Sequence, residues 1–228
     1  MIEFVFMLTH DDVTVPDAPE VLATLRDSGL RYVGFKDVGP PPEVLAEITA
    51  AAHDAGMEVM LEVVSTEAED ELSSLRAAPA IGVDWVLGGT HAEEGAAILA
   101  GADVRYCPFP GAVEGHPSVL SGDIDAIASD AARLTALDGV HGLDLLAYRH
   151  RDADPVALTR AVVEAADGPV IAAGSVASLE QIAALDGAGA WGFTIGGAIF
   201  ERRLPGGPTV AGQVSVVLEA AAGVEVRR

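Results

Sequence analysis

One pattern recurs along the whole chain: a helical stretch rich in alanine, then a glycine, then a short apolar run. Between two of these runs, in the stretch 42–55, Leu45, Ile48 and Ala52 share one face at helical spacing. Apolar runs that alternate with helices are typical of parallel strands buried on both faces. The predicted strands are 3–8, 29–36, 56–63, 82–88, 101–107, 142–148, 168–173 and 189–195.

Eight strand–helix units in 228 residues predict an α/β fold, a single (β/α)8 TIM barrel occupying residues 1–228 as one domain. The competing fold is an open doubly wound sheet, which needs a glycine-rich turn after its first strand. Residues 9–16 follow the first predicted strand and contain no glycine, which favours the barrel. The longest connection, 108–122, contains three prolines and three glycines, which is typical of a lid or a binding loop.

The charge of the chain excludes several kinds of partner. With 13 basic and 35 acidic residues, its formal net charge is −22, so we expect neither a nucleic acid nor a membrane surface as partner. Cys107 is the only cysteine, which excludes an intramolecular disulfide and fits a reducing cytoplasm. Residues 1–9 are apolar but lack a basic leader, and they are too short to span a bilayer. We therefore expect a cytoplasmic protein.

Barrels carry their functional residues at the carboxyl ends of the strands. The clearest signal there is a pair of short glycine loops, Gly174-Ser175 after the seventh predicted strand and Gly196-Gly197 after the eighth. Glycine lets backbone N–H groups approach an anion, and a short helical turn at 197–200 would point its N-terminus at the same place. These loops predict a phosphate site; the alternative is that the glycines form only tight turns.

The segment 170–182, followed by 192–201, resembles the C-terminal quarter of phosphate-binding barrels such as the histidine-biosynthesis ribotide isomerase and N-acetylmannosamine-6-phosphate 2-epimerase. The remainder of the chain is similar to them only in architecture. The resemblance implies a small phosphorylated metabolite held by Gly174, Ser175, Gly196 and Gly197. It does not identify the reaction, because the fifth predicted strand ends at Cys107 with no acid where the ribotide isomerases use a carboxylate.

Lys36 is the only lysine in the chain, and it falls at a strand end. A lysine in this place suggests a tunable amine: a Schiff-base nucleophile, a proton donor or a clamp on an enolate. The alternative is an ordinary pair with Asp37 on the rim. Glu62 lies near the end of another apolar strand, so its carboxylate must be paired or have a raised pKa. If Glu62 points inward it makes an acid–base couple with Lys36, and if outward it pairs with an arginine or caps a helix.

The histidines at strand ends are His10, His91, His116 and His150, whereas His53 and His141 are interpreted as structural. We expect His10 and His91 to assist catalysis. Alternatively, His10, His91 and His150 hold a metal ion together with Glu62 or Asp11, or they are rim residues that bond to loops or substrate. Arg149 is a candidate for a second phosphate or a carboxylate of the substrate, unless it only pairs with Asp152 and Asp154.

These residues lead to three hypotheses. The first is an enzyme, an isomerase, epimerase or aldolase-type lyase, that acts on a small phosphorylated metabolite by proton or Schiff-base chemistry without a cofactor. The second is a metal-dependent lyase or epimerase, and the third is a barrel that binds a phosphorylated metabolite without turnover. A homo-oligomeric state is left open.

Overall fold

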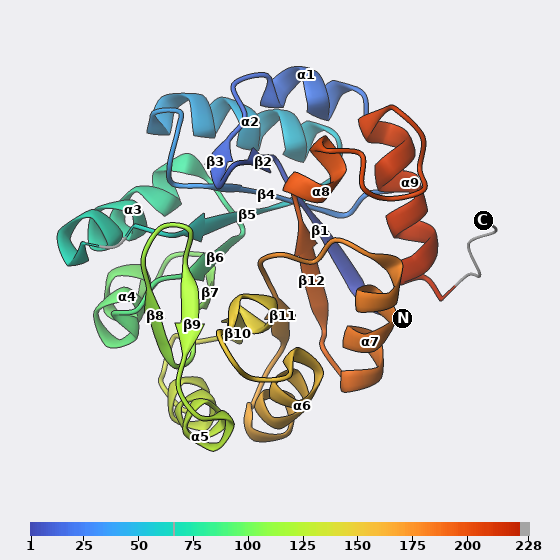
Figure 1. The fold of residues 1–228 in the computed structure, drawn as a ribbon. Helices are drawn as coiled ribbons and strands as arrows, with labels where there is room; N and C mark the ends of the chain where they lie inside the picture. The colour runs from blue at the N-terminus through green and yellow to red at the C-terminus, as the bar shows by residue number, and fades with distance from the viewer. Residues whose placement is uncertain (66, 224–228) are drawn as a thin grey trace.

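Eight parallel strands follow one another around a nearly closed barrel in the computed structural model, which describes residues 1–65 and 67–223 (Figure 1). The finding confirms the predicted (β/α)8 barrel. The barrel strands are β1 (Glu3–Met7), β4 (Tyr32–Lys36), β5 (Glu58–Val63), β6 (Trp85–Gly88), β7 (Arg105–Cys107), β10 (Leu143–Leu145), β11 (Val170–Ala172) and β12 (Gly192–Ile195). Their order around the sheet is β10-β11-β12-β1-β4-β5-β6-β7.

The barrel closes between β7 and β10, where no regular ladder forms. Two backbone hydrogen bonds join these segments, from His141 N to Tyr106 O at 2.8 Å and from Asp144 N to Pro108 O at 3.1 Å. The His141 ring accepts a further bond from Tyr106 N, which confirms a structural role for this histidine.

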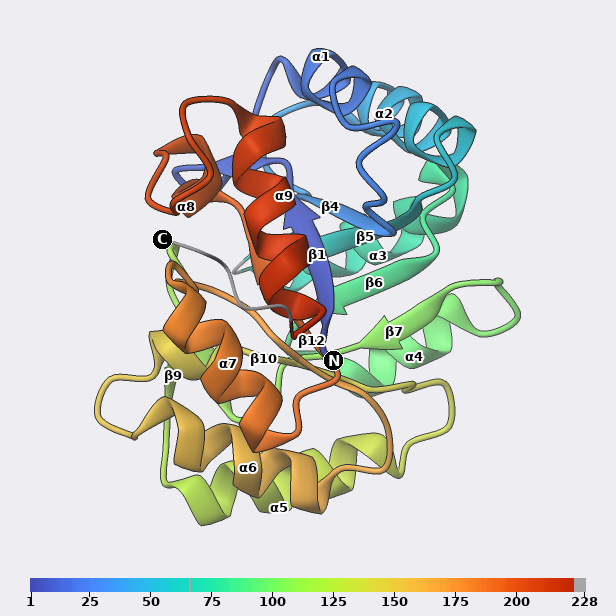
Figure 2. The same ribbon diagram turned by 90° about the vertical axis from the view of Figure 1, so that its right-hand side faces the viewer.

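Helices surround the strands on the outside of the barrel, and Figure 2 shows α9 lying along β1. They are α1 (Ala18–Ala23), α2 (Pro42–Asp54), α3 (Ala68–Ile81), α4 (Ala92–Leu99), α5 (Ile124–Thr135), α6 (Pro155–Ala165), α7 (Leu179–Ala188) and α9 (Val210–Ala221), whereas the short α8 (Gly197–Phe200) lies at the carboxyl end of β12. Gly82 and Gly189 end α3 and α7 in the left-handed conformation, as expected for a glycine that precedes a strand. Among the described residues, no helix combines the length and apolar character that a membrane crossing requires.

Side chains alternate between the helices and the barrel interior along each strand. The interior is closed at the amino ends of the strands by Tyr32 and Trp85, each with its ring centroid 5.5 Å from that of Trp191. Above them lies an apolar layer that includes Val5, Met60 and Ile171. This apolar filling separates the amino ends of the strands from the polar side chains at their carboxyl ends, where barrels place their sites.

Two hairpins decorate that end of the barrel. β2 (Thr9–His10) and β3 (Val13–Thr14) form the first, directly after β1. The second, β8 (Ala112–Glu114) and β9 (Val119–Ser121), lies within 108–122. The connection that we expected to be a lid or a binding loop therefore contains a folded hairpin.

Candidate functional site

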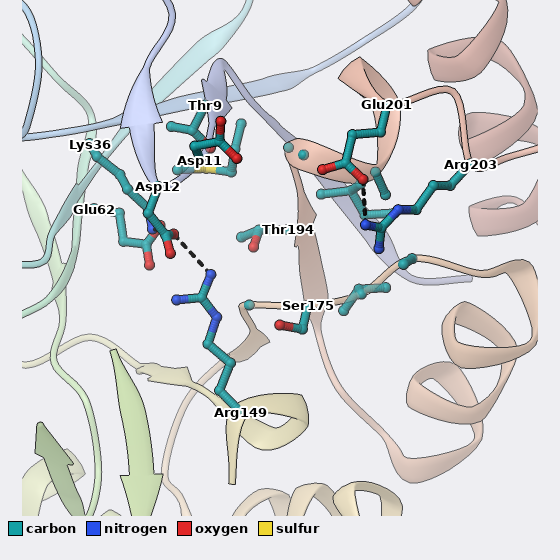
Figure 3. Close-up of a pocket in the computed structure, with 18 residues that line it drawn as sticks. Thr9, Asp11, Asp12, Lys36, Glu62, Arg149, Ser175, Thr194, Glu201 and Arg203 are labelled. Carbon is teal, nitrogen blue, oxygen red and sulfur yellow. Dashed lines mark hydrogen bonds and ion pairs between the residues drawn. The ribbon is translucent and has the colours of Figure 1, made fainter. Parts of the chain in front are cut away.

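A cavity of about 200 Å³ opens at the carboxyl ends of the strands (Figure 3). It brings together seven of the residues singled out from the sequence: Lys36, Glu62, Arg149, Gly174, Ser175, Gly196 and Gly197. Charged side chains occupy one end and the two glycine loops the other. The cavity is therefore polar at both ends of a short span, as a site for a small charged metabolite would be.

Lys36 and Glu62 form the closed end of the cavity. They are register partners on the neighbouring strands β4 and β5, so both side chains point into the barrel. Each is only 4% exposed, and Lys36 Nζ lies 3.7 Å from Glu62 Oε2. Of the two orientations considered for Glu62, the structure has the inward one. An ammonium and a carboxylate at this separation, both shielded from water, form a strong electrostatic pair.

Asp12 completes this charged group, and it was not predicted. Asp11 and Asp12 form the two-residue turn of the β2–β3 hairpin, with φ of 51° and 59°, the geometry of a type I′ turn. Thr14, on the returning strand, fastens the hairpin to the end of β4. Its hydroxyl donates to Lys36 O at 2.9 Å and accepts from Lys36 N at 3.0 Å. The turn thereby places the carboxylate of Asp12 in hydrogen-bonding contact with Lys36 Nζ.

The alternative of a rim pair between Lys36 and Asp37 is wrong. Adjacent residues of a strand point to opposite faces, and Asp37 turns away from the cavity. Its carboxylate accepts hydrogen bonds from Val64 N at 3.0 Å, from Ser65 Oγ at 2.6 Å and from Ser74 Oγ at 2.8 Å. Asp37 therefore ties β4 to the connection after β5 and to α3, and leaves Lys36 to Asp12 and Glu62.

Arg149 reaches the cavity from the 3₁₀ helix η1 (Ala147–Arg149), which follows β10. Its Nη2 donates to Asp12 Oδ1 at 2.9 Å, so it does not serve Asp152 or Asp154. Burial raises the pKa of the Asp12 carboxyl, but the hydrogen bonds from Arg149 and Lys36 outweigh it and lower that pKa to about 2. Asp12 is therefore ionised at neutral pH and holds both cations over the barrel.

The opposite end of the cavity is built by the two glycine loops. Gly174 and Ser175 follow β11 with φ of 75° and 60°, and the short helix α8 begins at Gly197 after β12. The first N–H groups of a helix have no intrahelical acceptor, so those of Gly197 and Ala198 are available to a ligand. A short helix at this place was predicted from the sequence.

The glycines in this end of the cavity also have packing reasons, which the sequence did not indicate. A Cβ at position 174 would lie 2.6 Å from Arg149 Nε, and one at position 196 would lie 2.6 Å from Thr9 Oγ1. At Gly197 the nearest atom to such a Cβ would be Glu201 Oε1, at 3.8 Å. Gly174 and Gly196 therefore allow close approach of neighbouring chain segments, whereas Gly197 keeps space open at the cavity.

Glu201 and Arg203 form an ion pair beside the glycine loops, as the dashed line in Figure 3 shows. Neither was predicted, because both follow the last barrel strand in a stretch whose path depends on α8. Together with Lys36 and Arg149, Arg203 makes the third cation of the cavity. Their clustering was not visible in the sequence, since the three residues come from three separate connections.

His10 lies at the rim, next to the residues of the glycine loops. Its Nε2 is 3.6 Å from Glu201 Oε1 and its Nδ1 is 3.6 Å from Asp11 Oδ2. His10, Asp11 and Glu201 each offer one ligand atom within 4.8 Å of the others, but all three side chains are substantially exposed. Exposed acidic groups of this kind are common without a metal ion.

His91 is not among the residues that line the cavity. It caps the start of α4, and its Nδ1 lies 3.0 Å from Oε2 of the buried Glu71 on α3. The hydrogen bond with Glu71 raises the pKa of His91. Glu71 also accepts bonds from Thr90 N and His91 N, both at 2.8 Å. His91 thus belongs to a cluster that joins α3 to the start of α4, apart from Lys36.

The metal set of His10, His91 and His150 does not form. His150 Nε2 lies 2.8 Å from Gly122 O, and its Nδ1 accepts from Asp152 N and Ala153 N. Both ring nitrogens are therefore occupied: one holds the residues between η1 and α6, and the other connects them to Gly122. His53, interpreted as structural, bonds to Asp84 Oδ2 at 2.8 Å.

Comparison with known proteins places the fold. No family model matches the sequence, and no curated protein matches it significantly. Among solved structures, a KDPGal aldolase is 17% identical with a TM-score of 0.68, covering 96% of this chain and 94% of that one. Orotidine 5'-phosphate decarboxylase from Pyrococcus horikoshii is 12% identical with a TM-score of 0.67, covering 97% and 100%. A mutant tryptophan synthase α-subunit from Pyrococcus furiosus is 14% identical with a TM-score of 0.64, covering 97% and 98%. At such identities the likeness concerns the (β/α)8 fold alone.

Proposed function

We propose that this chain is an enzyme that acts on a small phosphorylated metabolite by moving a proton next to a carbonyl group. The observation that carries the proposal is the cavity itself, which has the buried pair Lys36–Glu62 at one end and the loops of Gly174 and Gly197 at the other. A phosphate on the backbone N–H groups of the loops would anchor the substrate. Its reacting carbon would then lie against the charged end.

The charged end suits an enolisation. Glu62 is the candidate base, since its carboxylate can remove a proton from the carbon next to the carbonyl. The ammonium of Lys36 would stabilise the negative charge that develops on the carbonyl oxygen. Returning the proton to the other face of the carbon gives an epimer, and returning it to the neighbouring carbon gives an isomer. A lyase would reach an enolate by another route: Glu62 would take the proton of a hydroxyl group, the adjacent carbon–carbon bond would break, and an aldehyde would leave.

Schiff-base chemistry at Lys36 is the second candidate, favoured by the fact that the only lysine of the chain is buried in this cavity. The step requires a neutral amine, because the nitrogen lone pair attacks the carbonyl carbon and water leaves. Lys36 Nζ donates a hydrogen bond to Asp12 and forms an ion pair with Glu62, so both carboxylates already occupy the nitrogen that would have to attack. The arrangement therefore supports Lys36 as an electrostatic clamp more directly than as a nucleophile.

Three further features bear on the proposal. A net charge of −22 is compatible with a phosphorylated ligand, because backbone N–H groups and a helix N-terminus bind phosphate without basic side chains. Arg149 and Arg203 add positive charge along the cavity. The structural neighbours named above include an aldolase and a decarboxylase, which supports an enzyme without identifying its reaction.

The proposal is tested by incubating the protein in D₂O with dihydroxyacetone phosphate, xylulose 5-phosphate and fructose 6-phosphate, and following the substrate protons by NMR. We expect deuterium to enter one of these compounds, and we expect Glu62→Gln to slow the exchange by about 10² to 10⁴. The matched control is Glu58→Gln on the same strand, whose carboxylate bonds to Trp85 Nε1 at the far end of the barrel. Borohydride added to the same mixtures would trap a Schiff base, and an adduct that is absent from Lys36→Met would be assigned to Lys36 rather than to the N-terminal amine.

A barrel that only binds its ligand gives a different outcome. In that case the three compounds would bind, with no exchange and no adduct, and binding would survive Glu62→Gln. That result would overturn the enzymatic proposal and support a non-catalytic binding protein.

A further inference from the structure

Asp144 is a buried acidic residue that plays no part in the proposed reaction as described so far. It is the middle residue of β10, flanked by Leu143 and Leu145, which pack in an apolar cluster with residues of α5 and α6. Because alternate residues of a strand point to opposite faces, Asp144 points into the barrel. Its side chain is 0% exposed.

The register of the strands places Asp144 close to the level of the charged pair. Lys36 pairs with Glu62, Glu62 with Leu87, and Leu87 with Cys107, so one row of inward side chains crosses four neighbouring strands. Directly before the next strand Gly142 lies beside Cys107, since a Cβ on Gly142 would be 3.2 Å from Cys107 Sγ. Asp144 comes two residues later and its N donates to Pro108 O, so its carboxyl lies in the barrel interior one step beyond this row, toward the carboxyl ends of the strands.

Neither carboxyl oxygen of Asp144 has a hydrogen-bond partner among the described residues. An ionised carboxylate in such a place would lose its hydration without compensation, which costs at least several kcal/mol. A neutral carboxylic acid avoids most of that cost. Burial raises the pKa of Asp144 well above its ordinary value and the negative charge of Glu62 raises it further, while Lys36 and Arg149 act in the opposite direction.

The charge balance of the cavity leads to the same conclusion. Lys36 and Arg149 supply two positive charges, and Asp12 and Glu62 supply two negative ones, so these four groups balance. Glu201 and Arg203, which also line the cavity, balance each other as an ion pair. The remaining ionisable neighbour in the row is Cys107, and burial raises the pKa of its thiol so that it stays neutral. An ionised Asp144 would add one uncompensated negative charge to a closed space.

We propose that Asp144 is a neutral carboxylic acid in the native protein and that it acts as a positioning residue for Glu62, keeping Glu62 the single ionised carboxylate of the two. The protonation of Asp144 does not depend on the proposed function, whereas its role toward Glu62 in catalysis rests on that function. In the enolisation, Glu62 takes a proton from the substrate carbon and later returns it, and Asp144 keeps its own proton throughout. Glu62 and Asp144 together therefore hold one proton before the reaction and two protons when the enolate has formed.

The test is the pH titration of the aspartate carboxyl carbons by NMR, in the full chain labelled with ¹³C at aspartate Cγ. We expect one resonance to stay at the position of a protonated acid at pH 7, while ionised aspartates titrate near pH 4. Asp144→Asn should remove that resonance and no other. The matched control is Asp154→Asn, because Asp154 caps α6 by accepting from Ala157 N and should contribute an ordinary titrating resonance.

Coupling to Glu62 is tested in the same spectra. Replacing Glu62 by glutamine removes the negative charge that raises the pKa of Asp144, so the Asp144 resonance should begin to titrate at lower pH than in the wild type. A carboxyl that is merely buried would not respond to Glu62→Gln.

If Asp144→Asn fails to fold, the wild-type and Glu62→Gln titrations still decide the question. The proposal is overturned if every aspartate resonance is that of a carboxylate at pH 7, or if Glu62→Gln leaves the Asp144 titration where it was. Because no substrate is involved, failure of the proposed function would leave this result unchanged.

Discussion

The carboxylate of Asp12 accepts a hydrogen bond from Arg149 at 2.9 Å, although 137 residues separate the two along the chain. The same oxygen contacts Lys36, so a single carboxylate connects the first hairpin, β4 and η1. This contact bridges the mouth of the barrel from its first strands to its sixth. It fixes the positions of two cations that the cavity would need for any anionic substrate.

The first prediction concerns Asp12→Asn. Asparagine keeps the shape of the side chain but removes the charge that pairs Lys36 and Arg149, so we expect the free energy of unfolding at pH 7 to fall by about 2 kcal/mol or more. Because the pKa of Asp12 is lowered to about 2 in the folded protein, its stabilisation is present above the unfolded value of 3.8. It is lost as the pH falls through about 2. Urea unfolding between pH 2 and pH 7 measures both effects.

The control for this prediction is Asp11→Asn. Asp11 shares the turn and its positive φ, but its side chain is 85% exposed and does not bind Lys36 or Arg149. We expect it to change the stability at pH 7 by less than about 0.5 kcal/mol. If both variants lost the same free energy of unfolding, Asp12 would stabilise the protein through the turn and not through its contacts with Lys36 and Arg149.

The sequence predicted the residues whose positions follow from strand periodicity. Lys36 and Glu62 each lie at or near the end of an apolar run, and parallel pairing brings such ends together, so the pattern allowed their meeting as one of the two orientations considered for Glu62. Asp12 could not be found in this way. It reaches Lys36 only because two consecutive non-glycine residues adopt positive φ, and this conformation is uncommon for aspartate.

Sequence reasoning also assigned some strand-end residues to the site that the structure places elsewhere. His91 follows the fourth barrel strand, as a catalytic residue of a barrel would, but its partner Glu71 comes from the preceding helix α3. Nothing in the sequence distinguishes a histidine that faces the cavity from one that turns to a helix. Asp144 was missed for the converse reason, since a single acid between two leucines resembles an ordinary exposed strand position.

A second prediction concerns Gly197. A methyl group at this position meets no protein atom closer than 3.8 Å, so Gly197→Ala should fold normally while it narrows the end of the cavity where we place the phosphate. We expect inorganic phosphate to bind about tenfold more weakly, as measured by chemical-shift titration of the backbone amides. Gly187→Ala is the matched control, because this glycine lies in α7 with open space around it. If both variants bind phosphate like the wild type, the phosphate site is not at these loops.

The third prediction concerns the cluster of Glu71 and His91. The hydrogen bond that Glu71 accepts from the His91 ring raises the pKa of His91, so Glu71→Gln should lower that pKa toward its ordinary value, as followed by NMR titration of the imidazole. Because the pKa of His91 is raised in the folded protein, this hydrogen bond adds to the free energy of unfolding fully below about pH 6.5. That contribution is lost as the pH rises through the pKa that His91 has in the folded protein. Glu94→Gln, which removes a weaker negative neighbour, should shift the pKa less. An unchanged His91 titration in Glu71→Gln would contradict the assignment.

The last prediction separates two roles of Gly174. Its φ of 75° strains any residue with a Cβ, and a Cβ there would also lie 2.6 Å from Arg149 Nε, so Gly174→Ala should cost about 1–3 kcal/mol of stability and displace the guanidinium from Asp12. Once Asp12→Asn has already weakened that bridge, the displacement costs less, so the double variant should be more stable than the sum of the single losses predicts. Gly189→Ala serves as the control, since Gly189 has a φ of 89° but its nearest neighbour is Val163, not an arginine. The stability lost in Gly189→Ala should simply add to the stability lost in Asp12→Asn. Urea unfolding of the single and double variants measures the free energies of unfolding in both double-mutant cycles. Additive losses in both cycles would show that Gly174 serves only the backbone and that Arg149 does not depend on it.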